Sequence, residues 1–285
     1  MVQVAADPQR MKENAAPKFD TLERFMWPGG DEAKPAVNKN HIRMYGHNLC
    51  PFVERSRWTF AAKDVQFQEV FVDLNSKAGW HTEFNGGMIP VLEVPSGQLI
   101  PESQVIADYA LQVAGSEQGI KLIPDDPVQA ALMRAKMAEF DSKILSFSFG
   151  IYFAKYSAGE AMDKYVANAV PWNEALCPEV GSDKWLFGTD EITQLDIHIG
   201  AQWDFVYCQS RTPAFADGFG PANLPVVSPK WCAYMERLRS HPKLAPVAIS
   251  QEAADKHATR VRSWPAEERC QLSLDVLQGL FPNCP

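Results

Sequence analysis

A cysteine followed by a proline stands where a short apolar segment, residues 42–45, gives way to a predicted helix. Pro51 suits the first helical position because it has no N–H to leave unsatisfied. The helix dipole places positive potential where a Cys50 thiolate would form, which predicts a nucleophilic thiol with a lowered pKa. The alternative is a buried structural thiol, since free cysteine is often fully buried. Val53 occupies the place of the second cysteine in a dithiol motif, so redox chemistry here would need an external thiol.

The segment from residue 40 to 115 alternates between strand and helix patterns. The patterns predict strands at 41–46, 65–73, 89–94 and 97–100, and helices at 51–63 and 103–113. A strand, helix, strand unit followed by a hairpin and a closing helix forms a small α/β layer. Cys50 then falls at the carboxyl end of the first strand, where open α/β sheets bind ligands.

The pattern changes after Pro124, and the rest of the chain reads as an all-helical domain over residues 125–285. Apolar positions at helical spacing predict helices at 128–156, 193–209, 229–239 and 250–262. Thr193 and Asp196 resemble a capping box with a shorter acid in its third place. By contrast, residues 1–39 carry four prolines and a Gly-Gly pair, which predicts an irregular arm docked through residues 25–27.

Length and composition exclude several classes of protein. A chain of 285 residues with 46% hydrophobic residues is long enough for two domains with real cores. The net charge of −8 offers no basic footprint for nucleic acid. Six scattered cysteines without histidine partners indicate neither a zinc site nor a disulfide framework, and we expect no bound metal. Without a long apolar span or a recognisable leader, we expect a cytoplasmic protein.

Two further positions could recognise a peptide-like ligand. Pro90 heads an apolar strand, and a cis Ile89–Pro90 bond would leave the Ile89 backbone free to pair with an extended peptide. The alternative is a trans proline at the start of an edge strand. Glu102 and Ser103 precede a helix, where Ser103 could be the N-cap and nothing more. Together they could also bind the ammonium and carboxylate groups of an amino acid. A thiol, peptide amides and an amino-acid head are all found in glutathione.

These motifs, in this order and spacing, resemble the glutathione transferase superfamily and within it the omega class. The similarity runs from residue 41 to about 113, and in the helical half only through Phe187-Gly188 and residues 193–196. It implies a thioredoxin-like domain followed by an all-α domain that holds the second-substrate site. It also implies roles for single residues: Cys50 as the catalytic thiol, Ile89 ahead of cis-Pro90 on the glutathione backbone, Glu102 and Ser103 on the γ-glutamyl group, Lys77 on the glycine carboxylate, and Phe52 in the same glutathione site. From the residue alone, Lys77 is a solvated loop lysine.

The resemblance implies a glutathione-dependent thiol transferase and reductase that acts on mixed disulfides, dehydroascorbate and S-substituted glutathione conjugates, as a homodimer with glutathione as co-substrate. Alternatives on the same fold are a chloride intracellular channel-like protein, a dehydroascorbate or glutathionyl-hydroquinone reductase, and a non-catalytic binding protein. The sequence departs from the class pattern in its long arm, in a shorter segment at residues 85–88, and near the C-terminus. There, Asp255, His257 and Arg260 stand where aromatic residues are expected, and Trp264 lies nearby in the sequence.

Overall fold

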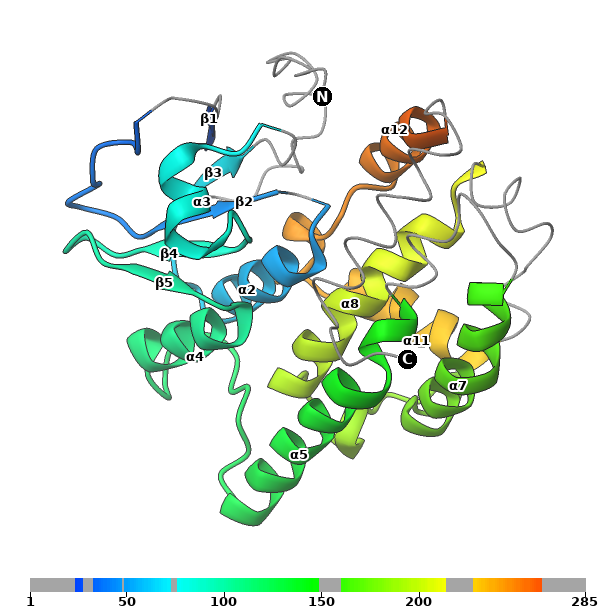
Figure 1. Cartoon of the computed structure of the whole chain (residues 1–285). Helices are drawn as coiled ribbons and strands as arrows, with labels where there is room; N and C mark the ends of the chain where they lie inside the picture. The colour runs from blue at the N-terminus through cyan, green and yellow to red at the C-terminus, as the bar shows by residue number, and fades with distance from the viewer. Residues whose placement is uncertain are drawn as a thin grey trace. The chain divides into compact units, whose positions relative to one another are not determined.

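The computed structural model describes residues 24–27, 33–47, 49–72, 76–148, 160–213 and 228–262, with only the backbone for 24–27, 160–162 and 260–262 (Figure 1). Within them the chain forms two compact units. The first contains the described residues up to Lys121 together with Pro242–Ala253. The second contains Leu122–His241 and the described residues from Ala254 onwards.

The first unit is built on a mixed five-stranded sheet in the order β1-β3-β2-β4-β5. Its strands are β1 (Arg24–Trp27), β2 (Arg43–Gly46), β3 (Gln68–Val72), β4 (Val91–Glu93) and β5 (Leu99–Pro101). β1 and β2 both pair in parallel with β3, whereas β4 pairs antiparallel with β2 and β5. Apart from β1, these strands confirm the predicted ones, and all but β5 lie inside the predicted bounds.

Successive residues of β2 point to opposite faces of the sheet, as the two-residue period of a strand requires. Met44 joins a core cluster with residues of α2 (Pro51–Ala62) and α4 (Ser103–Ala114), so these helices cover one face (Figure 1). Tyr45 lies on the other face, where Trp80 of α3 (Gly79–Asn85) packs against its ring at 5.1 Å. α2 and α4 confirm the predicted helices, but α3 lies where the sequence analysis expected a loop.

The expectation of an irregular arm over residues 1–39 is wrong for Arg24–Trp27, which form β1. This strand pairs with Glu69–Val72 of β3. A four-residue strand between proline- and glycine-rich stretches is too short to show a period, and its partner lies more than forty residues away. Further along the arm, Lys34 forms an ion pair with Glu93 of β4. The arm residues before 24 and at 28–32 lie outside the described residues.

The second unit is helical in its described part: α5 (Pro127–Lys143), α7 (Glu160–Leu176), η1 (Leu186–Gly188), α8 (Gln194–Ser210) and α11 (Pro229–Arg239). α8 and α11 confirm the predicted helices, whereas α5 ends well before residue 156 and α7 was not predicted. The capping box of α8 is confirmed, because Thr193 and Asp196 satisfy each other's backbone groups. Asp196 also accepts hydrogen bonds from Leu186 N–H (2.9 Å) and the Tyr234 hydroxyl (2.7 Å).

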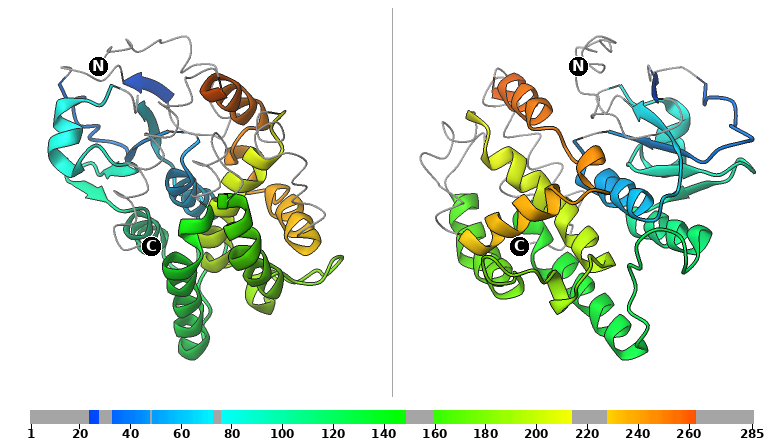
Figure 2. Two further views of the ribbon diagram at one scale, coloured as in Figure 1. Left: turned by 45° about the vertical axis from the view of Figure 1, so that its right-hand side comes forward. Right: turned by 180° about the vertical axis from the view of Figure 1, so that it is seen from behind.

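A segment of the C-terminal half packs into the first unit. We call Pro242–Ala253 the returning segment; it contains η2 (Ala245–Val247) and the start of α12 (Gln251–Arg262). η2 packs against α2, and both views show the two side by side (Figures 1 and 2). Lys243 pairs with Asp64, just beyond the end of α2. The sequence pattern predicted this segment as part of the helical domain.

Among the described helices, none has the length and apolar character to cross a membrane.

We expect Asp196→Ala to lower the free energy of unfolding by about 3 kcal/mol, because it leaves buried donors from Thr193, Leu186 and Tyr234 without an acceptor. Urea unfolding followed by tryptophan fluorescence measures the change. Asp190→Ala is the control, since Asp190 is exposed and pairs only with Lys184 at the surface. Equal stability of the two variants would contradict a structural role for Asp196.

Candidate active site

Cys50 is the N-cap residue of α2, in extended backbone conformation at φ −89° and ψ 119°. Pro51 follows as the first helical residue. The Cys50 N–H donates to the His47 carbonyl at 3.0 Å, and the Cys50 carbonyl accepts the Glu54 N–H at 3.0 Å. The cysteine packs against the apolar cluster beneath α2 and is half-buried. The predicted order of strand, cysteine, proline and helix is confirmed.

The prediction of a lowered pKa for Cys50 is wrong. Burial raises the pKa of the thiol from its ordinary 9.0 to about 11, because a thiolate loses water when it leaves solvent. Hydrogen bonds from the backbone N–H groups of Val53 and Phe52 and the charge of Arg57 act in the opposite direction, while Glu54 adds to the rise. The helix N-terminus therefore favours the thiolate as expected, but desolvation outweighs it.

The Ile89–Pro90 peptide bond is cis, which confirms the possibility that the sequence left open. Ile89 is partly buried and packs against the clusters on both faces of the sheet. No backbone hydrogen bond joins it to another of the described residues. Cys50 also packs against one of these clusters, the one that contains residues of α2 and α4.

Ser103 is not the N-cap of α4, as the sequence suggested, but its first helical residue. The N-cap is Glu102, which is exposed and has a left-handed φ of 70°. Such a backbone is costly for a residue with a side chain, and it often marks a functional position. Ser103 is buried, and its hydroxyl accepts a hydrogen bond from Arg55 at 3.3 Å. The start of α4 is thereby joined to the helix that carries Cys50.

The remaining two predicted site residues are Phe52 and Lys77, and each contacts residues close to it in the sequence. Phe52 is half-buried, with the Arg55 guanidinium 5.7 Å from its ring centroid. Lys77 is exposed, and its Nζ lies 3.5 Å from the Gly86 carbonyl. The stem of Lys77 also fills the space beside Gly87, where a Cβ atom would come within 2.5 Å of it. Lys77 thus lies against the short segment after α3, and within the described residues it forms no hydrogen bond or ion pair with another predicted site residue.

The four residues noted near the C-terminus are either in the second unit or outside the description of the structure. Asp255 and His257 lie on α12 in the second unit. The side chain of Arg260 and the whole of Trp264 lie outside the described residues. The second-substrate site expected in the helical domain stays a prediction.

The sequence analysis missed the buried polar side chains in the first two turns of α2. Arg57 pairs with Glu69 of β3 at 2.6 Å, and neither side chain is exposed. Arg55 binds Ser103, and the Ser56 hydroxyl donates to the Ser103 carbonyl at 3.4 Å. The sequence did carry a signal for these buried pairs. Three charged residues, Glu54, Arg55 and Arg57, follow Cys50 closely in a helix whose residues are nearly all buried. Charged groups are buried only when other groups pair with them.

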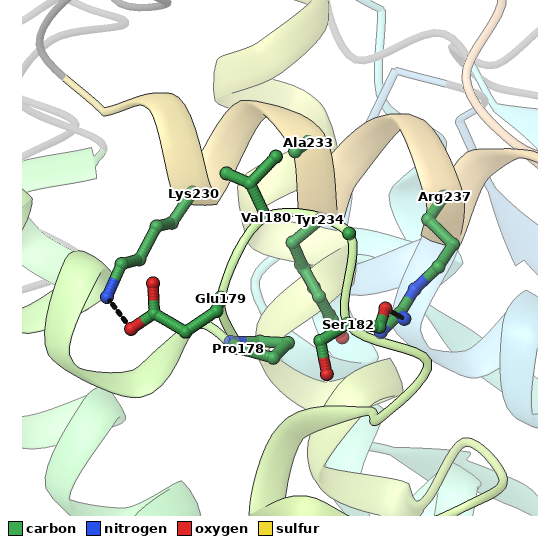
Figure 3. Close-up of a pocket in the computed structure, with 9 residues that line it drawn as sticks. Pro178, Glu179, Val180, Ser182, Lys230, Ala233, Tyr234 and Arg237 are labelled. Atoms are coloured by element: carbon green, nitrogen blue, oxygen red, sulfur yellow. Dashed lines mark hydrogen bonds and ion pairs between the residues drawn. The ribbon is translucent and has the colours of Figure 1, made fainter.

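A separate surface pocket of about 210 Å³ lies in the second unit, between residues 178–182 and α11 (Figure 3). Its two cationic side chains already have partners. Lys230 pairs with Glu179 at 2.5 Å, as the dashed line in Figure 3 marks. Arg237 donates to the carbonyls of Ser182 and Lys184 and stacks on Trp185. No thiol lines this pocket, and we assign it no role.

Among the described residues, no cluster of His, Cys, Asp and Glu is arranged to hold a metal ion.

The first unit, with its cis-proline ahead of β4 and helices on both faces of the sheet, defines a thioredoxin-like domain, and a helical unit follows it. Residues 49–112 match the family model "Glutathione S-transferase, N-terminal domain". This part of the chain is therefore similar to the N-terminal domain of glutathione S-transferases, and the curated relatives that share the similarity include omega proteins.

Two relatives illustrate the similarity. The glutathione S-transferase omega-1 of Sus scrofa is 35% identical over 118 residues, which are 41% of this chain and 47% of the relative. The omega-2 protein of Homo sapiens is 36% identical over 109 residues, which are 38% of this chain and 43% of the relative. The chain thus spans about half the length of the curated relatives it matches.

Solved structures extend the similarity of fold to most of the chain. The tau class glutathione S-transferase of Mangifera indica superposes with a TM-score of 0.64 at 22% identity, over 78% of this chain and 99% of that one. Glutathione transferase Omega 3C of Trametes versicolor has a TM-score of 0.60 at 19% identity, over 78% and 90%. A glutathione transferase homologue from Drosophila mojavensis, solved with bound glutathione, has a TM-score of 0.59 at 21% identity, over 79% and 98%. At these identities the similarity shows the fold alone.

We expect iodoacetamide to alkylate Cys50 slowly near pH 7, with a rate that rises about tenfold per pH unit up to pH 10, because a thiol with a pKa of about 11 ionises only above that range. Mass spectrometry of the Cys50 peptide gives the rate, and free glutathione serves as reference. A rate that is already constant below pH 8 would mean that the helix N-terminus outweighs burial.

We expect Glu102→Gly to raise the free energy of unfolding by about 1 kcal/mol, because glycine adopts the backbone at φ 70° without strain. Glu102→Ala is the matched control: it also removes the carboxylate but keeps the strain. Thermal or urea unfolding of the two variants compares them. If the alanine variant were as stable as the glycine variant, the left-handed backbone would not be the cause.

Proposed function

We propose that this protein is a glutathione-dependent thiol transferase and reductase of the omega type, which works through a mixed disulfide between Cys50 and glutathione. The observation that carries the proposal is the Cys50 thiol at the N-cap of α2, followed directly by Pro51. The backbone N–H groups of Val53 and Phe52 act there to lower the pKa of the thiol. A thiol in this place supports exchange with a glutathionyl sulfur. Because no hydroxyl stands there to activate glutathione, we expect conjugation to ordinary electrophiles to be weak.

Glutathione fits the groups arranged around this thiol. The Ile89 backbone ahead of cis-Pro90 is the partner we propose for the cysteinyl amide of glutathione, by strand addition. Glu102 would receive the γ-glutamyl ammonium group, and the N-terminus of α4 at Ser103 its carboxylate. Bound glutathione in the Drosophila mojavensis homologue supports the choice of ligand.

Two predicted contacts complete the proposed glutathione site. Lys77 is exposed and can turn towards the glycine carboxylate of glutathione. Phe52 lies in the first turn of α2, two residues after Cys50, with the Arg55 guanidinium 5.7 Å from its ring centroid.

The exchange reaction proceeds in two balanced steps. The Cys50 thiolate attacks the glutathione sulfur of a mixed disulfide, and the S–S bond breaks. The released thiolate takes up a proton, so the substrate is reduced while Cys50 is glutathionylated. A second glutathione thiolate then attacks this disulfide, which releases oxidised glutathione and restores Cys50. With an S-substituted conjugate, the leaving group is a carbanion that takes up the proton. Dehydroascorbate accepts two electrons overall from two molecules of glutathione, which become the disulfide.

We assign the second step to an external thiol because Val53 takes the place of a resolving cysteine. Of the other cysteines that the structure describes, Cys177, Cys208 and Cys232 are buried in the second unit, while Cys270 and Cys284 lie outside the described residues. Since burial raises the pKa of Cys50, the step that depends on its thiolate should speed up as the pH rises. We further propose, from the resemblance to the omega class, a cytoplasmic homodimer whose second substrate is bound by the helical unit.

Intact mass tests the proposal. After treatment with oxidised glutathione, we expect one glutathione on the wild type, none on Cys50→Ala, and release by reduced glutathione. Dehydroascorbate reduction should be lost in the same variant. The variant should keep its far-ultraviolet circular dichroism, because the side chain is small and only half-buried.

An unmodified Cys50 in a folded protein would contradict the proposal. A vesicle leakage assay would then test the chloride intracellular channel-like alternative. Turnover with glutathionyl-hydroquinones, in place of mixed disulfides, would instead favour the related reductase.

A further inference from the structure

A carboxylate lies buried one helical turn behind Cys50. Glu54 follows Cys50 by four residues, in the first turn of α2, and its backbone N–H donates to the Cys50 carbonyl at 3.0 Å. Glu54 is fully buried, and one of its carboxylate oxygens accepts a hydrogen bond from the Ile249 N–H at 2.9 Å. A buried carboxylate is costly and persists where it is hydrogen-bonded.

The donor belongs to the returning segment, which lies 195 residues away in sequence. Val247 and Ile249 of this segment are buried. Because η2 packs against α2 within the first unit, this hydrogen bond ties the helix that carries the thiol to a distant part of the chain (Figure 2).

Other charged groups near the thiol have partners of their own. Arg57 pairs with Glu69 at 2.6 Å, and Arg55 donates to Ser103 of α4. Lys243 of the returning segment pairs with Asp64. His47, on the loop before the thiol, accepts the Leu49 N–H. The charge of Arg57 lowers the pKa of Cys50 and that of Glu54 raises it, so Glu54 opposes the thiolate.

We propose that Glu54 is a positioning residue for Cys50: the hydrogen bond from Ile249 fixes its carboxylate and offsets part of its charge, so the returning segment controls how readily the thiol ionises. The negative charge of the Glu54 carboxylate makes Cys50 harder to ionise, and the hydrogen bond from the Ile249 N–H weakens this influence. The link to turnover rests on the proposed function, but the effect on the thiol itself does not.

Two substitutions at Glu54 separate its charge from its shape. Glu54→Gln keeps the size and an acceptor oxygen for Ile249 but removes the charge, so Cys50 alkylation should become about tenfold faster at pH 8. Glu54→Asp keeps the charge but draws it back from the Ile249 N–H, so alkylation should become slower than in the wild type. Glu83→Gln, on the exposed side of α3, is the matched control and should leave the rate unchanged.

The opposite changes in alkylation rate distinguish this role from a merely structural one. If Glu54 only supported the fold, both substitutions would expose Cys50 and speed its alkylation. Near-ultraviolet circular dichroism verifies that each variant is folded, and the aspartate variant decides the question if the glutamine variant does not fold. Alkylation rates equal to the wild type, or raised in both folded variants, would overturn the proposal. Glutathionylation measured on the same samples tests the proposed function separately: a shifted alkylation profile without glutathionylation would contradict that function and leave the role of Glu54 intact.

Discussion

The buried ion pair between Arg57 of α2 and Glu69 of β3 is the interaction on which the candidate site depends. Both side chains are fully buried at 2.6 Å, and breaking such a pair costs about 3–5 kcal/mol because an uncompensated charge remains inside. Glu69 lies in the strand that pairs with both β1 and β2. The pair therefore fixes α2 against the sheet. Because Cys50 is the N-cap of α2, its position after β2 is fixed as well.

The thiol occupies a place where two physical effects compete. Backbone N–H groups at the start of α2 stabilise a thiolate, whereas burial against the apolar core destabilises it. A half-buried thiol ionises less readily than an exposed one. The charges of Arg57 and Glu54 also shift the pKa of this thiol, in opposite directions. Charges act more strongly on a buried group than on an exposed one, because less water screens them.

Local signals account for what could be predicted. The Cys50-Pro51 helix start, the strands β2 to β5 and the helices α8 and α11 follow from periodicity and capping within a few residues of each position. The short helix α3 was missed because its seven residues carry no clear apolar period. The same holds for β1, which becomes a strand only because β3 offers a parallel edge. Ser103 had the chemistry of an N-cap, but the left-handed turn at Glu102 moved the helix start by one residue.

The sequence by itself determined that a thioredoxin-like layer precedes a helical region, and which residues stand around the thiol. The tertiary structure decided the cis form of the Ile89–Pro90 bond, the raised pKa of Cys50, the backbone of Glu102 and the return of Pro242–Ala253 to the first unit. The reason is physical: helix capping and strand alternation act over a few neighbouring residues, whereas burial and electrostatics depend on groups that only folding brings together.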